Sequence, residues 1–168
     1  MGKKNLFDEE GIDKLREMVD KIDTCLFCTN PQTTDGATCV PMSAQEVDDE
    51  GNIWFFSGRN SGKNKEIEIE NKVQLIFSHP SRSSYLVVNG EAEISLDKEK
   101  VAYLWSPLVK AWFKEGKEDP NISLLKVKTK SAYYWDVEGS RMVNFLKMAA
   151  SVVVGQNLVD SEEGSINV

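Results

Sequence analysis

The sequence predicts a mainly β fold, in which an antiparallel sheet closes into a barrel with helices packed on it. Short apolar stretches of strand-like composition are separated by residues typical of turns. Consecutive stretches are joined by turns rather than by long helices, which favours this fold over a doubly wound parallel sheet. Helical periodicity occurs at the start, in the middle and at the end of the chain.

The first predicted element is an amphipathic helix that ends near residue 22. Ile12, Leu15, Val19 and Ile22 recur at spacings of three and four residues, with charged residues between them. Asp8 is the predicted N-cap, because acidic residues follow it in the first turn.

Three further helices are predicted. A short one covers residues 63–70, and a second begins at Asp97 and runs, with an interruption at Ser106–Pro107, to about residue 113. The last covers residues 141–154 and is apolar on more than one side, which indicates burial in a core or against a second chain.

The predicted strands are short and bounded by turn residues. Pro41 indicates a bulge or a sheet edge within its strand. Asn89-Gly90 predicts a hairpin turn between two strands, because both residues tolerate positive φ. The predicted strands span residues 24–29, 37–44, 53–57, 73–78, 85–88, 91–95, 123–127 and 132–137.

The composition indicates one domain over residues 1–168. Lys and Arg number 20 against 27 Asp and Glu, a net charge of −7, which argues against nucleic-acid binding because phosphate contacts need clustered basic residues. No run of ~20 apolar residues is present, so no membrane-spanning segment is expected, and the N-terminal stretch lacks the apolar core of a signal peptide. With only three cysteines, a reduced, cytoplasmic setting is the simplest interpretation.

Neither the cysteines nor the single histidine suggest a catalytic or metal site. Cys25 and Cys28 are expected on opposite faces of one strand because their separation is odd, so they should neither share a zinc ion nor form a disulfide with each other. Ordinary buried cysteines are the expected outcome. His79 precedes a proline at a strand end, and no nucleophile motif accompanies it, so a surface turn residue is expected.

The stretch most typical of ligand binding runs from Ser57 to Lys63. A hydrophobic strand delivers two hydroxyl groups, Ser57 and Ser61, and a short helix begins at Lys63 after a flexible turn. Backbone N–H groups at a helix N-terminus favour an anion, and Lys63 adds a point charge. This arrangement suits a phosphate monoester, and the alternative is a polar surface turn with a helix cap.

Aromatic residues gather around the strand ends and the middle helix. A phosphate site beside them would suit a ligand with one anionic end and one flat aromatic end. Core packing explains most of the set, but explains Trp112 and Phe113 less well, because they border a polar loop. The aromatic residues are Trp54, Phe55, Phe56, Tyr85, Trp105, Trp112, Phe113, Tyr133, Tyr134 and Trp135.

Several short motifs occur in a characteristic order and spacing. They are Val40-Pro41-Met42-Ser43, Ile53-Trp-Phe-Phe-Ser57 with Ser61-x-Lys63, Val88-Asn-Gly-Glu-Ala92, Ala111-Trp-Phe113 with Gly116 and Glu118-Asp-Pro-Asn121, and Tyr133-Tyr-Trp-Asp136. Through them the chain resembles, over nearly its whole length, the general stress protein branch of the pyridoxamine 5′-phosphate oxidase-like flavoproteins. The resemblance implies an FMN-binding split β-barrel that forms a homodimer, with flavin in clefts between the subunits.

The resemblance also implies a set of cofactor-binding residues. It places the FMN phosphate near Ser61 and Lys63, and the strand from Cys39 to Ser43 along the ribityl chain and ring edge. Tyr85 and Trp135 match positions that reach the flavin from the other chain, and Trp112 would cover the ring. The full set is Cys39, Val40, Pro41, Met42, Phe56, Ser57, Ser61, Lys63, Tyr85, Trp112 and Trp135.

Some positions depart from the family pattern. Gly62 stands where the oxidases usually carry an arginine, and Val40 stands where this branch commonly carries one. Arg59 or Lys65 could supply the missing charge. The C-terminal Arg-Leu-His-Asp-Arg run of the oxidases is absent, so pyridoxine phosphate is not an expected substrate.

The function implied by the resemblance is that of an FMN-dependent oxidoreductase of a stress-related family, with a nicotinamide or another electron donor. The flavin would supply the redox chemistry and the protein its binding and electrostatics. One alternative is a non-enzymatic flavin-binding or flavin-sensing protein, and another is a ligand-free dimeric scaffold. Cys39 is expected near the flavin as an inert lining residue, with a thiol of flavin-altered reactivity as the alternative.

Overall fold

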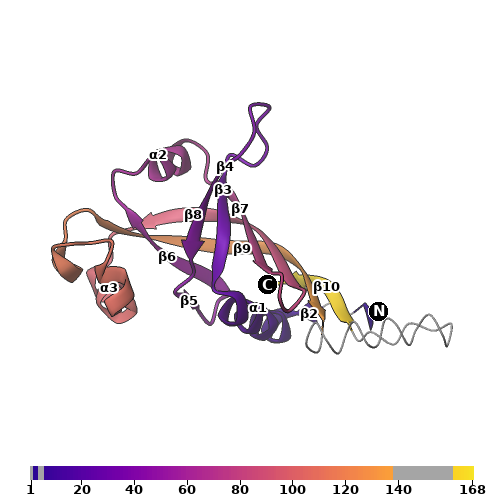
Figure 1. Ribbon diagram of the computed structural model, residues 1–168. Helices are drawn as coiled ribbons and strands as arrows, with labels where there is room; N and C mark the ends of the chain where they lie inside the picture. The colour runs from indigo at the N-terminus through magenta and orange to yellow at the C-terminus, as the bar shows by residue number, and fades with distance from the viewer. Residues whose placement is uncertain (1, 4–5, 138–160) are drawn as a thin grey trace.

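A computed structural model describes residues 2–3, 6–137 and 161–168 of the 168-residue chain. Within these residues, strands form one sheet that helices cover in part (Figure 1). The strands are β1 (Gly2–Lys3), β2 (Leu6–Phe7), β3 (Thr24–Thr29), β4 (Thr38–Ser43), β5 (Glu46–Val47), β6 (Asn52–Gly58), β7 (Lys72–His79), β8 (Ser84–Ser95), β9 (Ile122–Val137) and β10 (Ser161–Asn167). The helices are α1 (Asp8–Ile22), α2 (Gly62–Ile69), α3 (Lys98–Leu104) and α4 (Pro107–Lys110), with a 3-10 turn η1 (Gly116–Glu118).

The sheet is open and mixed. Its main path runs β1-β10-β9-β8-β7-β3-β4, while β6 pairs with the first part of β9 and with β5. The pairing is antiparallel except where β10 meets β1 and β2 in parallel. The predicted mainly β fold with antiparallel pairing is confirmed. Full closure is not, because in the described part of the chain β4 pairs only with β3.

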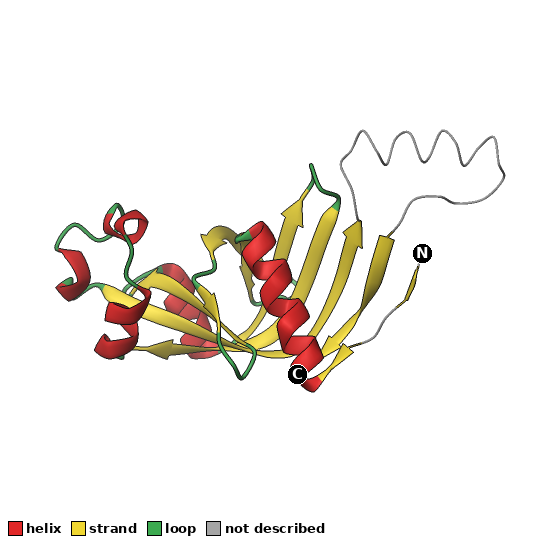
Figure 2. Cartoon of the chain, turned by 90° about the horizontal axis from the view of Figure 1, so that it is seen from below, coloured by secondary structure: helices red, strands yellow, loops and turns green. Residues whose placement is uncertain are grey.

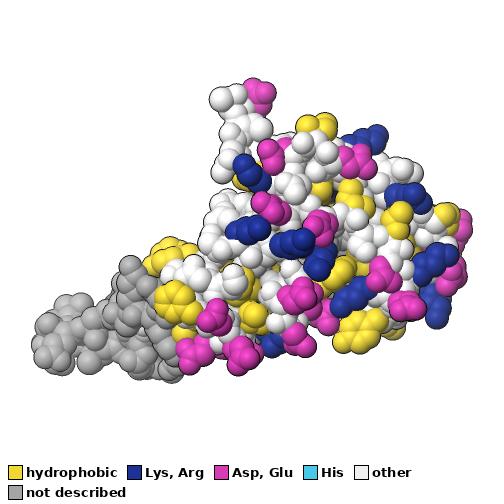
Figure 3. Space-filling view, turned by 180° about the vertical axis from the view of Figure 1, so that it is seen from behind, with side chains coloured by type: hydrophobic (Ala, Val, Ile, Leu, Met, Phe, Trp, Pro, Cys, Tyr) yellow, Lys and Arg dark blue, Asp and Glu magenta, His cyan; other side chains and the backbone are white. Residues whose placement is uncertain are grey.

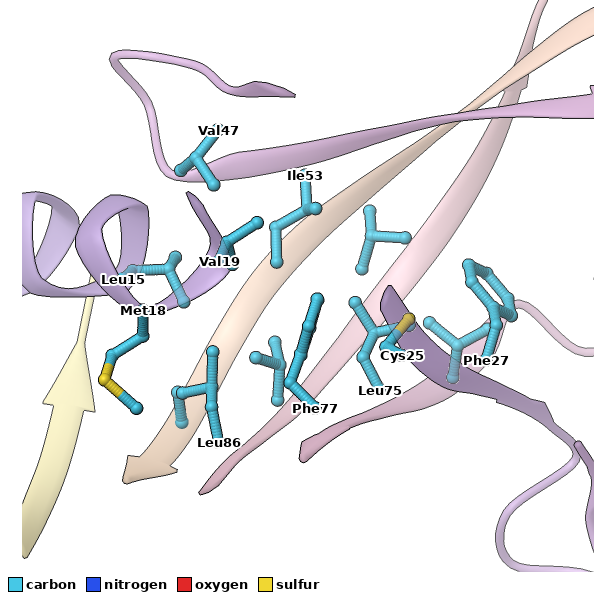
Figure 4. Close-up of a cluster of buried hydrophobic side chains, with 14 of the residues drawn as sticks. Leu15, Met18, Val19, Cys25, Phe27, Val47, Ile53, Leu75, Phe77 and Leu86 are labelled. Carbon is cyan, nitrogen blue, oxygen red and sulfur yellow. The ribbon is translucent and has the colours of Figure 1, made fainter. Parts of the chain in front are cut away.

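Helix α1 lies across one face of the sheet (Figure 2). Leu15, Val19 and Ile22 of its predicted apolar side are buried, whereas Ile12 is half-buried. Figure 4 shows Leu15, Met18 and Val19 among side chains from the strands, with which they form the main core. Gly11 lets the helix approach β10, since a Cβ there would lie 3.0 Å from the carbonyl oxygen of Asn167. The prediction of Asp8 as the N-cap is wrong, because Asp8 is the first helical residue and Phe7 holds the N-cap position.

A second hydrophobic cluster lies where α3 and α4 meet β6 and β9. Trp54, Val109 and Phe113 are buried there. The helix expected to run to residue 113 is two short helices, because Pro107 occupies the first turn of α4, where a proline begins a helix rather than continuing one.

The predicted hairpin at Asn89-Gly90 is wrong. These residues lie within one continuous strand, β8, at a bulge in its pairing with β9. Neither has the positive φ that a tight hairpin turn requires. The glycine serves a close approach instead, because a Cβ on Gly90 would collide with the carbonyl oxygen of Lys128.

The strands predicted over residues 123–127 and 132–137 are likewise one strand, β9. The polar segment between them resembles a turn in sequence, but its lysines pair with β8: Lys128 Nζ lies 2.6 Å from Glu93, and Lys130 Nζ lies 3.2 Å from Glu91. The predicted helix at 141–154 lies outside the described residues. No helix in the described ranges is long and apolar enough to cross a membrane.

Candidate functional site

A buried asparagine that the sequence analysis missed holds the start of α2. Asn64 is 1% exposed. Its Oδ1 accepts hydrogen bonds from Ser57 Oγ at 2.7 Å and Ser61 Oγ at 3.1 Å, and its Nδ2 donates to Ser123 Oγ at 2.9 Å. These partners lie on β6, at the helix cap and on β9, so the network fixes the helix start on the sheet.

The same network assigns a structural role to two predicted phosphate ligands. Ser61 is the N-cap of α2, and its Oγ accepts from the backbone N–H of Asn64 at 3.2 Å. Ser57 is buried. With their protons directed to Asn64, the two hydroxyls shape the anion site rather than donate to it. A serine three residues before a polar side chain at the start of a helix is a capping signal that would have drawn attention to Asn64.

Lys63 is the group at this end of the sheet that suits an anion. It is half-buried in the first turn of α2, and burial lowers the pKa of its ammonium, although Glu66 acts in the opposite direction. Among the residues placed in the structure, no carboxylate lies within ion-pair distance of it. Gly62 leaves open space beside it, since a Cβ there would meet nothing within 4 Å. An unpaired, partly desolvated cation beside free helix N–H groups is an anion-binding arrangement.

The predicted residues of β4 alternate between two faces. Val40 and Met42 pack against the main core, whereas Cys39 and Pro41 are exposed on the other face. Because β4 is an edge strand in the described part of the sheet, its outer backbone groups are open to a ligand or a second chain.

The cysteines differ from expectation in their pairing. Cys25 is buried in the main core and free, and Cys28 points to the opposite face, as predicted. Cys28, however, lies directly opposite Cys39 in the register of β3 and β4, and the two form a disulfide. The expectation that all three thiols are reduced is therefore wrong, and Cys39 is not a free lining thiol.

Tyr85 and Trp135 lie far from Lys63 within one chain. They face each other across β8 and β9, and each is 40% exposed. Ser123, which binds Asn64, and Trp135 stand near opposite ends of β9. At ~3.3 Å per residue, the stretch of β9 between Ser123 and Trp135 is ~40 Å long. A single chain therefore does not bring these predicted ligands into one site.

The remaining predicted aromatic residues lie near the second cluster. Phe56 is half-buried, with its ring centroid 6.1 Å from those of Trp105 and Phe113. Trp112 is 83% exposed next to them. Phe56 therefore packs within the cluster, whereas Trp112 is free to cover a ligand.

A cleft of about 790 Å³ lies elsewhere, between α1, β5 and α3. Most of its charged lining is acidic, so it would repel a phosphate. Figure 3 shows acidic and basic side chains interspersed on one face of the molecule rather than gathered in a basic patch. The cleft residues are Arg16, Asp20, Gln45, Glu46, Val47, Asp48, Asp49, Asp97, Glu99, Lys100 and Tyr103.

The open sheet, the helix across one face and the capped helix start beside Lys63 define a split-barrel protein. A family model described as "Pyridoxamine 5'-phosphate oxidase like" matches residues 10–160. The chain belongs to this family, which confirms the resemblance found in the sequence.

Individual relatives agree with this assignment. Protein bli-3 of Neurospora crassa is 26% identical over 107 residues, which are 57% of this chain and about half (49%) of that protein. A crystal structure described as a general stress protein 26 from Jannaschia sp. CCS1 has a TM-score of 0.78 at 22% identity and covers 96% of this chain and 99% of its own. The general stress FMN/FAD binding protein of Xanthomonas citri has a TM-score of 0.64 at 27% identity, covering 77% of this chain and 90% of its own.

Proposed function

We propose that this chain binds FMN in sites shared between two copies and acts as an oxidoreductase with a nicotinamide or similar electron donor. Lys63 carries the proposal, as a half-buried ammonium group without an ion-pair partner in the described chain, at the start of a helix fixed on the sheet. The family and the FMN/FAD-binding Xanthomonas citri relative support a flavin as the ligand. A cytoplasmic setting, where reduced nicotinamides occur, is part of the proposal.

The residues present fit the phosphate end of FMN. Lys63 would supply the charge, the N–H groups of Gly62 and Lys63 would supply hydrogen bonds, and the exposed Arg59 stands close along the chain. The open space at Gly62 admits a phosphate where an arginine would otherwise stand. The exposed face of β4 and the exposed Trp112 would hold the rest of the cofactor. When bound, the flavin would supply hydride or electron transfer.

The separation of the predicted ligands supports a homodimer. Tyr85 and Trp135 can join Lys63 in one site only if they come from a second copy, because they lie at the far end of β9. Apolar side chains on their face of the sheet follow one cross-strand row, and Leu26 in that row is 46% exposed. The row is Pro41, Leu26, Ile76, Val87 and Tyr133.

Flavin titration tests the phosphate assignment. Lys63→Ala should weaken FMN binding about tenfold to a hundredfold, because a charge-assisted hydrogen bond contributes roughly 1.5–3 kcal/mol. Lys72→Ala is the matched control, since Lys72 is an exposed lysine at the start of β7 and should change affinity little. Equal dissociation constants for the natural chain and Lys63→Ala would contradict the assignment.

Subunit complementation tests the shared site. In a homodimer of Lys63→Ala, or of Trp135→Ala, both sites carry the defect. In a mixed dimer of the two variants, one site carries both defects and the other carries neither. Mixing should therefore restore tight binding at up to half of the sites in mixed dimers. Failure to restore any tight site, with mixed dimers demonstrated by mass spectrometry, would place all the ligands in one chain.

Turnover of a reduced nicotinamide distinguishes the proposed enzyme from the alternative, a non-enzymatic flavin-binding or flavin-sensing protein. Oxidation of a reduced nicotinamide by the flavin-loaded protein supports the enzyme. Tight flavin binding without turnover of any nicotinamide donor favours the sensor.

A further inference from the structure

The Cys28–Cys39 disulfide joins residues directly opposite each other on two adjacent antiparallel strands, with their Cα atoms 4.1 Å apart. It lies where the hairpin of β3 and β4 opens into its loop. In a reducing compartment, such as the one proposed above, persistent structural disulfides are rare and those present are usually transient. The bond is therefore a candidate for reversible exchange.

The two sulfur-bearing residues differ in access. Cys39 is exposed on the edge strand β4, whereas Cys28 is only 2% exposed. An incoming thiolate (RS⁻) can therefore reach the sulfur of Cys39 more readily than that of Cys28. Its attack forms an R–S–S–Cys39 mixed disulfide and releases Cys28 as the thiolate. A second thiolate then forms RSSR and releases Cys39, so two thiols are oxidised as the disulfide is reduced.

The third cysteine does not compete in this exchange. Cys25 faces the main core, and burial raises the pKa of its thiol to about 12. The thiol is therefore protonated and unreactive at neutral pH.

The next pair of residues toward the loop connects the disulfide to the proposed phosphate site. Thr29 lies opposite Thr38, with its hydroxyl oxygen 3.3 Å from the backbone oxygen of Thr38. The hydroxyls of both threonines donate to the carboxylate of Glu66 in α2, that of Thr38 at 3.2 Å. Glu66 stands one turn after Lys63 and acts on its charge. The disulfide is thus connected to α2 through the adjacent residues Thr29 and Thr38 and their hydrogen bonds to Glu66.

We propose that Cys28–Cys39 is a reversible thiol–disulfide exchange site, entered at Cys39 by a low-molecular-weight thiol, and that its state sets the rigidity of the start of α2. The exchange rests on the two cysteines and on the proposed cytoplasmic setting, and not on flavin binding. Its consequence for ligand affinity rests on the proposed function, since α2 carries Lys63. Oxidation holds Thr29 and Thr38 in register for Glu66, and reduction loosens this anchor.

Equilibration of the natural full-length chain in glutathione buffers tests the exchange. After acid quench and alkylation, peptide mapping should show a Cys28–Cys39 bridge whose fraction follows the ratio of reduced to oxidised glutathione. Cys25→Ala should give the same curve. A bridge that is absent at every ratio, or that never opens under native conditions, would overturn the proposal.

Single variants test the point of entry. With glutathione disulfide, Cys28→Ser should form a mixed disulfide at Cys39 at least tenfold faster than Cys39→Ser forms one at Cys28. Equal rates in two variants with native circular dichroism would overturn the assignment. If a variant does not fold, glutathione trapped on partly reduced natural chain decides instead, with Cys39 supporting the proposal and Cys28 contradicting it.

Hydrogen–deuterium exchange tests the coupling without a flavin. Backbone amides of α2 should exchange at least threefold faster in the reduced than in the oxidised protein, and Glu66→Ala should abolish the difference. Equal exchange in both states of the natural chain would overturn the coupling. FMN affinity measured in both states then separates the proposals: no binding in either state contradicts the proposed function and leaves the mapping and exchange results valid.

Discussion

The two ends of β9 hold charged groups in opposite situations. Near one end, Asp136 is buried, with Lys14 Nζ at 3.0 Å, Lys21 Nζ at 2.5 Å and Ser84 Oγ at 2.9 Å. Beside the other end, Lys63 is half-buried without an ion-pair partner in the described chain. The first group has all its partners within the fold, and the second is available to a ligand.

Both pKa values are lowered, with opposite meanings. Burial would raise the pKa of Asp136, but hydrogen bonds from Lys21, Lys14 and Ser84 outweigh it, so the charged form is favoured. Burial lowers the pKa of Lys63 because the charged form is disfavoured. Asp136 therefore contributes stability above its unfolded pKa of about 3.9, which is lost as pH falls through the folded pKa. Lys63 costs stability at neutral pH, and this cost disappears as pH rises through its folded pKa toward the ordinary value of 10.5.

The largest predicted effect is on the satisfied group. Asp136→Asn should lower the free energy of unfolding by about 3 kcal/mol at pH 7, because it leaves two partly buried lysines without their carboxylate. It should also reduce the loss of stability between about pH 4 and the folded pKa. Urea denaturation across this pH range measures both effects.

The control is an ion pair on α1, the helix that carries both lysines. Glu17→Gln removes the pair between Lys14 and the exposed Glu17 carboxylate, leaves Lys14 bound to Asp136, and should cost no more than about 0.5 kcal/mol. If Asp136→Asn costs as little as this control, water replaces the carboxylate and the contrast between the two ends of β9 does not hold.

The second predicted effect concerns Asn64, whose hydrogen bonds fix the helix start that carries Lys63. Asn64→Ala should lower the free energy of unfolding by about 2 kcal/mol, because it removes the acceptor of the buried Ser57 hydroxyl and the donor to Ser123 Oγ. It should also weaken FMN binding, since the helix start is no longer fixed. Asn60→Ala, at an exposed position, should change stability by less than about 0.5 kcal/mol. An unchanged affinity in Asn64→Ala would show that the network serves folding alone.

The sequence predicted those parts of the fold that depend on local patterns. The strand at residues 24–29 was predicted with its observed ends, since an apolar stretch between turn residues defines it. The polar strand β10 was missed, because its position depends on pairing with β9 and not on its own alternation. The hairpin predicted at Asn89-Gly90 was wrong for a similar reason. The glycine is required by the close approach of Lys128, which belongs to another strand.

The site divides along the same line. The strand, turn and helix that carry Ser57, Ser61 and Lys63 follow one another in the chain as predicted, although the two serine hydroxyls bond to Asn64. The partners that come from elsewhere were not predicted, as with Ser123 for Asn64 and Glu66 for Thr29. The Cys28–Cys39 pair lies between these cases. Once the hairpin loop is placed at residues 30–37, counting outward along both strands brings the two cysteines opposite each other.

The smallest predicted effect has the opposite sign to the first. Lys63→Met keeps most of the buried stem and removes a charge that has no ion-pair partner in the described chain, so the protein should become more stable at pH 7. The gain should not exceed about 1 kcal/mol, because the half-exposed ammonium keeps part of its hydration. It should shrink as pH rises toward 10.5, where the natural lysine is also neutral. Urea denaturation at pH 7 and pH 9.5 measures this trend, with Lys65→Met as the exposed control on the same helix. A loss of more than about 1 kcal/mol at pH 7 would mean that Lys63 is a structural charge like those around Asp136, and not one reserved for a ligand.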